Sequence, residues 1–210
     1  MKRPRATKKV RLSEQVKSVT LVDAPVEKCV SAIRRSWARF GPTEVTPLAK
    51  WRATKDFLLP LKSFKTKIVV APLQAATVLI KDMYGEDSFV NALAASKNLR
   101  VQVLGAILQD ERRIIRYAAS GKITREVAYY VEDGSWTYAA KGEPLPSERD
   151  IGVEDESLTL SNAVRIVKET MNVALPPVWS ELREAVGISR SLSAIRVPIL
   201  NWTTIDDVGE

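Results

Sequence analysis

Between residues 26 and 40, apolar side chains recur every three or four positions, which is the spacing of one face of a helix. Asp23 is a candidate N-cap, Pro25 falls in the first turn, and Gly41 follows the last apolar position. The pattern therefore predicts a helix over about 25–40, with an apolar stripe of Val26, Cys29, Val30, Ile33, Trp37 and Phe40.

Segments rich in alternating or β-branched residues predict strands over most of the region up to residue 140. Gly121 and the Asp133-Gly134 pair separate the last three segments, which predicts an antiparallel meander. A short helix is expected over about 87–97. The expected strands cover residues 18–23, 43–48, 64–71, 76–82, 99–108, 113–119, 122–131 and 135–140.

A second helical stripe runs from Thr159 to Leu175 and predicts a late helix over about 159–175. Residues 141–157, which precede it, are rich in proline, glycine and acids, so we expect a loop there. A shorter helix is expected to end at Gly187, with Trp179, Leu182 and Val186 on its inner side. The chain then divides into a disordered basic arm (1–15), a single domain (16–187) and a C-terminal extension (188–210).

These elements predict an α+β fold with a largely antiparallel sheet. We expect the early helix (about 25–40) and the late helix (about 159–175) to pack on one face, as in a two-layer sandwich. A helix-grip arrangement, in which the late helix lies across a curved sheet, is the alternative. That arrangement would leave room for a ligand cavity.

The basic charge is concentrated at the start of the chain. The whole sequence has 32 Lys and Arg against 25 Asp and Glu, for a net charge of +7. Residues 12–210 are nearly neutral, because six basic residues and no acid lie in the first eleven positions. Such an arm can bind the phosphates of a nucleic acid or act as a solvated tail. Its basic residues are Lys2, Arg3, Arg5, Lys8, Lys9 and Arg11.

The single cysteine, Cys29, excludes an intrachain disulfide and gives no indication of an oxidising compartment. No apolar run is long enough to span a membrane, and charged residues interrupt the segment after the basic start. We therefore expect a cytoplasmic protein without a membrane partner. Because Cys29 lies on the apolar stripe, we expect it to be buried and unreactive.

The absence of histidine excludes Ser-His-Asp and Cys-His catalysis and, with one cysteine, an intrachain zinc site. Glycine-rich phosphate-binding loops are absent as well. We expect no catalytic, cofactor-binding or metal-binding residues, and a protein that is not an enzyme. An enzyme alternative would use magnesium held by Glu148, Asp150 or Asp155.

Three further features suggest interaction sites. An acidic group within the 141–157 loop is a candidate surface for a protein partner. It consists of Glu148, Asp150, Glu154, Asp155 and Glu156. Arg125 lies on a strand whose residues Ile123, Val127, Tyr129 and Val131 share one parity, and we expect it to pair with an acid or to bind an anion. Tyr129, Tyr130, Trp136 and Tyr138 surround the predicted hairpin, where core packing is favoured over a nucleobase-stacking platform.

Two segments resemble known families. Residues 133–138 (DGSWTY) followed by 142–148 (GEPLPSE) resemble a W-x-Y…G-x-P-L-P-x-E segment of uncharacterised bacterial α+β proteins, some of them similar to immunity proteins of polymorphic toxin systems. That resemblance covers about residues 75–175. Residues 22–27 (VDAPVE) look like the strand-to-helix entry of helix-grip ligand-binding domains. Neither resemblance implies catalytic residues.

The sequence therefore favours a bacterial, non-enzymatic binding protein that recognises a protein partner, as immunity-like proteins do. One alternative is a nucleic-acid-associated protein that uses residues 1–11 within a larger assembly. Another is a helix-grip binder of an apolar small molecule.

Overall fold

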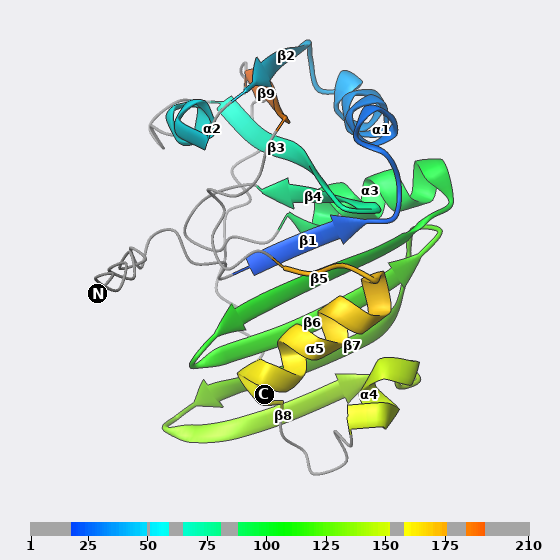
Figure 1. Cartoon of the computed structure of the whole chain (residues 1–210), viewed down its shortest axis with the longest axis vertical. Coiled ribbons are helices and arrows are strands. Elements are labelled where there is room, and N and C mark those ends of the chain that lie inside the picture. Colours follow the sequence, from blue (N-terminus) through cyan, green and yellow to red (C-terminus); the bar gives the residue numbers. More distant parts are fainter. Residues whose placement is uncertain are drawn as a thin grey trace, which may run out of the picture.

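A computed structural model describes residues 18–49, 51–58, 65–80, 88–151, 158–175 and 184–191 (Figure 1). Its helices are α1 (Val26–Ala38), α2 (Trp51–Leu58), α3 (Phe89–Leu99), α4 (Pro146–Ile151) and α5 (Leu160–Met171). Its strands are β1 (Ser18–Val22), β2 (Thr43–Leu48), β3 (Lys65–Leu73), β4 (Ala76–Ile80), β5 (Gln102–Gln109), β6 (Arg112–Ala119), β7 (Lys122–Glu132), β8 (Ser135–Lys141) and β9 (Ala185–Ser191). The α+β class that the sequence predicts is confirmed.

All of these strands belong to one antiparallel sheet, in the order β2-β9-β3-β4-β1-β5-β6-β7-β8. The predicted meander, β6 to β8, forms one half of it together with β5 (Figure 1). The other half is assembled from strands distant in sequence, because β9 lies between β2 and β3. Among the described residues, β2 and β8 are the two edges of the sheet.

The two long predicted helices pack against opposite faces of the sheet, so the expectation of a shared face is wrong. Adjacent residues of β1 face different apolar clusters: Leu21 lies in the cluster with Val167 of α5, and Val22 lies in the cluster with Ile33 of α1. Helix α3 also joins the α1 cluster through Phe89. The centre of the sheet is therefore covered on both sides.

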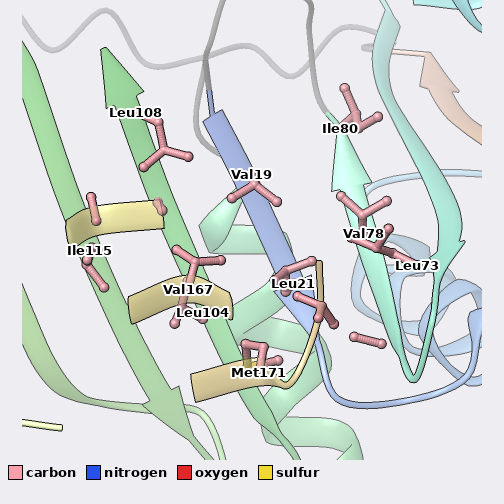
Figure 2. Close-up of a cluster of buried hydrophobic side chains, with 14 of the residues drawn as sticks. Val19, Leu21, Leu73, Val78, Ile80, Leu104, Leu108, Ile115, Val167 and Met171 are labelled. Carbon is pink, nitrogen blue, oxygen red and sulfur yellow. The ribbon is translucent and has the colours of Figure 1, made fainter. Parts of the chain in front are cut away.

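Under α5, apolar side chains fill the space between the helix and the sheet (Figure 2). Val167, Leu104 of β5 and Ile115 of β6 are fully buried there, and Met171 lies near Leu21. Side chains of α5 therefore meet those of the strands directly. Such packing argues against the expected alternative of an apolar ligand cavity beneath this part of the helix.

Three elements differ from the sequence-based expectation. Helix α2 forms in a segment for which no element was predicted, and α4 lies within the expected 141–157 loop. Val186 and Gly187, expected at the end of a helix, instead belong to strand β9, which continues through residues 188–191 of the expected C-terminal extension. At the start of α1, Pro25 rather than Asp23 holds the N-cap position.

None of the helices in the described ranges combines the length and the apolar character needed to cross a lipid bilayer.

Candidate interaction site

The edge strand β8 lies at the end of the meander and is the first component of the candidate site. Within the described residues, it pairs only with β7. Its residues 135–140 include no charged residue and no proline. The opposite edge strand, β2, contains Pro47, which cannot donate a backbone hydrogen bond. Because charges and prolines are the usual protection of edge strands, β8 is the edge better suited to pairing with another chain.

The turn between β7 and β8 determines which backbone groups face the open edge. Asp133 and Gly134 both have positive φ, 49° and 78°, as a two-residue type I′ turn requires. The pair Glu132 and Ser135 closes this turn, and the backbone groups of the following β8 residues alternate in direction. The N–H and C=O groups that point away from β7 are therefore those of Trp136, Tyr138 and Ala140.

An aromatic platform lies beside this edge, on the face of the sheet that α5 covers. The rings of Tyr129 and Trp136 stack with centroids 4.5 Å apart and an interplanar angle of 8°. Trp136 remains 46% exposed, whereas Tyr129 is half-buried and packs against the core. The preference for core packing is therefore wrong for Trp136, since a residue at the edge has no outer strand to cover its ring.

Arg113 of β6 fixes this platform from the inner side. Its guanidinium lies 4.9 Å from the centroid of Trp136 and 5.7 Å from that of Tyr129. It donates hydrogen bonds to the carbonyl of Asp110, at 2.6 Å, and to that of Leu158, at 3.3 Å, just before α5. The three side chains, which we call the Arg113–Trp136 platform, thus combine the residue types most common at energetically important protein contacts.

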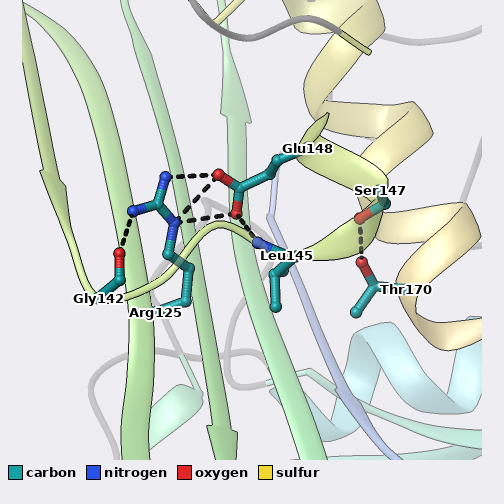
Figure 3. A network of polar contacts seen from close by, with 6 residues as sticks. All are labelled: Arg125, Gly142, Leu145, Ser147, Glu148 and Thr170. Atoms are coloured by element: carbon teal, nitrogen blue, oxygen red, sulfur yellow. Dashed lines mark hydrogen bonds and ion pairs between the residues drawn. The ribbon is translucent and has the colours of Figure 1, made fainter. Parts of the chain in front are cut away.

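A buried ion pair supports the far end of β8 (Figure 3). The Nε of Arg125 donates to Glu148 at 3.0 Å, and its Nη2 donates to the same carboxylate at 2.5 Å. Its Nη1 donates to the carbonyl of Gly142 at 2.7 Å. Arg125 and Glu148 are only 5% and 3% exposed. The expected pairing of Arg125 with an acid is confirmed.

A β-bulge in β7 lies directly before Arg125. The register with β6 shifts between Tyr117 and Ala118, so that Tyr117 faces Arg125 while Ala118 faces Ile123. Ile123 therefore lies on the opposite face of the sheet from Arg125. The expectation that Ile123 shares a face with Val127, Tyr129 and Val131 is wrong. An extra residue in a bulge reverses the alternation on one side of it.

The electrostatics of the pair favour a permanently charged Arg125. Burial by itself would lower the pKa of its guanidinium, but hydrogen bonds to Glu148 and the charge of that carboxylate raise the pKa above its ordinary value.

Glu148 also accepts from the backbone N–H of Leu145 at 3.3 Å, as a residue in the first turn of a helix can. The Ser147 and Thr170 hydroxyls, 2.7 Å apart, connect α4 to α5.

Of the five acids expected to form one surface, the structure describes only Glu148 and Asp150. Glu148 is buried against Arg125 rather than exposed in a loop. Asp150 belongs to α4. Glu154, Asp155 and Glu156 lie outside the described residues, as do the six basic residues of the expected arm, Lys2 to Arg11. Among the residues that are described, no three His, Cys, Asp or Glu side chains form a group that could hold a metal ion.

Cys29 occupies the interior, as the apolar stripe predicts. It is fully buried, and burial raises the pKa of its thiol from 9.0 to about 11. Its Sγ lies 3.7 Å from the carbonyl of Ala24. A thiol that is both inaccessible and protonated near neutral pH is a poor nucleophile.

Sequence reasoning did not single out Arg113, although it completes the platform. The available signal was its position in the Arg112-Arg113-Ile114-Ile115-Arg116 segment, where alternation puts Arg113 on the face of Ile115. Its contact with Trp136 could not be predicted, because that contact joins β6 to β8 across β7.

Neither the family models nor the curated proteins nor the solved structures provide a match to this chain.

Proposed function

We propose that the protein is a non-enzymatic binding protein that recognises a protein partner through β8. In this proposal an extended segment of the partner pairs with the open edge of β8, and one of its side chains contacts Trp136. The observation that carries the proposal is the 46% exposure of a tryptophan stacked on Tyr129 at an edge without charges or prolines from 135 to 140.

Strand addition fits this surface better than binding through an acidic loop. Backbone groups of Trp136, Tyr138 and Ala140 face outward and can supply main-chain hydrogen bonds, which give such complexes much of their affinity. The Arg113–Trp136 platform supplies a rigid aromatic contact for specificity. The buried Arg125–Glu148 pair holds the chain that follows β8, so the edge is ordered before a partner arrives.

The resemblance to immunity proteins of bacterial toxin systems is compatible with this binding role, and we extend it to a cytoplasmic location. Residues of the resembling segments take structural parts: Gly142 and Glu148 hold Arg125, and Leu145 is buried in the core. Trp136 of the same segments is the exposed residue. On this proposal, the segments support and present the contact surface.

The test uses two variants and a matched control for each. Trp136→Ala removes the exposed ring, and Val90→Ala removes an even more exposed apolar side chain, 78% exposed, from α3. Ala140→Pro removes an outward N–H without removing a hydrogen bond to β7, and Ala140→Val keeps that N–H. Partners are isolated on the tagged full-length chain from its native host, after nuclease treatment and at high salt.

We expect one protein to bind the unchanged chain, Val90→Ala and Ala140→Val. Its affinity should fall about tenfold or more for Trp136→Ala, as at a hot-spot residue, and it should fall for Ala140→Pro as well. Equal binding by all variants would refute the β8 site. Loss of all partners on nuclease treatment would instead favour the nucleic-acid alternative.

A further inference from the structure

A groove runs between the outward face of α1 and the start of β2, far from β8 in the strand order. Its volume is about 760 Å³, and its walls include Arg34 and Arg35 of α1 and Thr43 of β2. No acidic residue lines it. A second groove, which shares Ser31 and Arg35 with the first, is also lined by Asp23 and Glu27, so its charge is mixed. Of these two grooves, the first is the one whose charged lining residues are all basic.

In the part of the chain that the structure describes, the arginines at and near this groove have no acidic partners. No carboxylate within the described ranges forms an ion pair with Arg34, Arg35, Arg39 or Arg190. Arg34 is instead positioned by Thr43, whose hydroxyl accepts from its Nε at 3.5 Å. Since surface arginines commonly pair with nearby acids or extend into water, Arg34 and Arg35 in the walls of the groove create a local excess of positive charge. Arg39 and Arg190, which both contact Phe40 at the end of α1, add to it.

Arg190 adds a partly buried positive charge near the groove. It lies directly opposite Thr43 in the pairing of β9 with β2. Its guanidinium lies 5.4 Å from the ring centroid of Trp37 and 4.7 Å from that of Phe40. Its Nε and Nη1 are buried and have no hydrogen-bond partner. The aromatic rings hold the cation in place, but nothing described around it neutralises its charge.

An exposed ring stands at the same end of α1. Phe40 is 40% exposed, and the guanidinium of Arg39 lies 4.5 Å from its centroid. Phe40 therefore contacts two arginines, Arg39 and Arg190. Contacts with the same ring hold both guanidinium groups in place. Binding of a ligand would therefore cost less side-chain conformational entropy.

We propose that this groove is a binding site for a phosphate group, with Arg34 and Arg35 as its direct ligands. Planar guanidinium groups match the geometry of phosphate oxygens and form charge-assisted hydrogen bonds with them. Arg39 and Arg190 contribute charge without direct contact, and the Thr43 hydroxyl completes the polar wall. This site is independent of the protein-binding role proposed for β8, and either can fail without the other.

The phosphate can belong to a small phosphorylated compound or to a nucleic-acid backbone, and two probes distinguish these sources. Inorganic tripolyphosphate represents the first source, and a single-stranded oligothymidine represents the second. Binding of each to the full-length chain is measured by titration calorimetry at two salt concentrations. A background variant with Gln at the six basic positions of residues 1–11 separates binding by that segment.

The decisive variant is Arg34→Gln/Arg35→Gln, and its matched control is Arg112→Gln/Lys122→Gln. All four residues are exposed, and both variants remove two positive charges, but Arg112 and Lys122 lie on β6 and β7. We expect tripolyphosphate affinity to fall tenfold or more in the first variant and less than twofold in the second. Circular dichroism and thermal unfolding should show both variants folded.

Equal losses in the two double variants would overturn the proposal, because they would reflect net charge alone. Undiminished binding by Arg34→Gln/Arg35→Gln would overturn it as well. If the oligonucleotide follows the same pattern as tripolyphosphate in the background variant, the source is a nucleic-acid backbone. If only tripolyphosphate depends on Arg34 and Arg35, the source is a small phosphorylated compound.

Discussion

Arg125 shows how a single charged residue can sit inside an apolar sheet. Its guanidinium contacts Glu148 and the carbonyl of Gly142, so its donors are satisfied although it is 5% exposed. This arrangement requires a glycine at position 142 for two reasons. Its φ of 85° is rarely adopted by other residues, and a side chain there would collide with the carbonyl of Thr124.

Removing one member of this pair should destabilise the protein strongly. We expect Arg125→Met or Glu148→Gln to lower the free energy of unfolding by about 3–5 kcal/mol, since each leaves a buried partner unsatisfied. Arg125→Met/Glu148→Leu should cost clearly less than the sum of two single losses, because no isolated charge or polar group remains. Urea unfolding followed by circular dichroism measures each difference.

The exposed pair of Arg165 and Glu169, 2.7 Å apart on α5, is the matched control. Arg165→Ala should change the free energy of unfolding by no more than about 0.5 kcal/mol, because exposed helical ion pairs contribute little. Comparable losses at Arg125 and Arg165 would contradict the proposed importance of burial.

At single positions, the sequence predicted which type of residue a side chain contacts better than it predicted which individual residue that is. The position of Arg125 on an apolar strand predicted an acidic partner, but nothing local identified Glu148, which lies 23 positions away. Trp136 was expected in the core, yet it is nearly half exposed. Its exposure depends on β8 being an edge, and the order of strands is a property of the whole sheet.

At the scale of elements, local patterns predicted α1, α3, α5 and the strands of the meander close to their observed bounds. They failed for β9, because residues 185–191 become a strand through pairing with two distant strands. Gly187 there lies under the ring of Phe57 of α2, where a larger residue would collide. Strands β1 and β4 are buried along almost their whole length, because both faces of the sheet are covered there. Strands covered on both faces lack the alternation of buried and exposed positions, and this lack indicates a central strand.

The start of α5 provides a test at this scale. The hydroxyl of Thr159 accepts from the backbone N–H of Asn162 at 3.1 Å and caps the helix. We expect Thr159→Ala to lower the free energy of unfolding by about 1 kcal/mol, and Thr159→Ser to lower it much less, because serine keeps the hydroxyl. Thermal or urea unfolding distinguishes the two. Equal losses would mean that the threonine methyl group, rather than the cap, matters.

At the scale of the molecule, the shared strand β1 couples the two faces of the sheet. Leu21 packs toward α5, and its neighbour Val22 packs toward α1. We expect Leu21→Ala and Val22→Ala each to cost on the order of 2–4 kcal/mol. Each should also reduce hydrogen-exchange protection of both α1 and α5, because the faces unfold together. Loss confined to the helix nearer the substitution would instead indicate two separately cooperative layers.

The position of β9 has a consequence for synthesis on the ribosome. Ser189 of β9 contacts Glu44 of β2 across 145 positions, and β9 fills the place between β2 and β3. A nascent chain that has emerged only as far as α5 has the meander available but lacks the strand that joins β2 to the rest. Folding of a growing chain proceeds from its earlier part, so the edge of β3 stays open until β9 arrives. During that interval β3 is an additional open edge at which the chain can mispair with another chain.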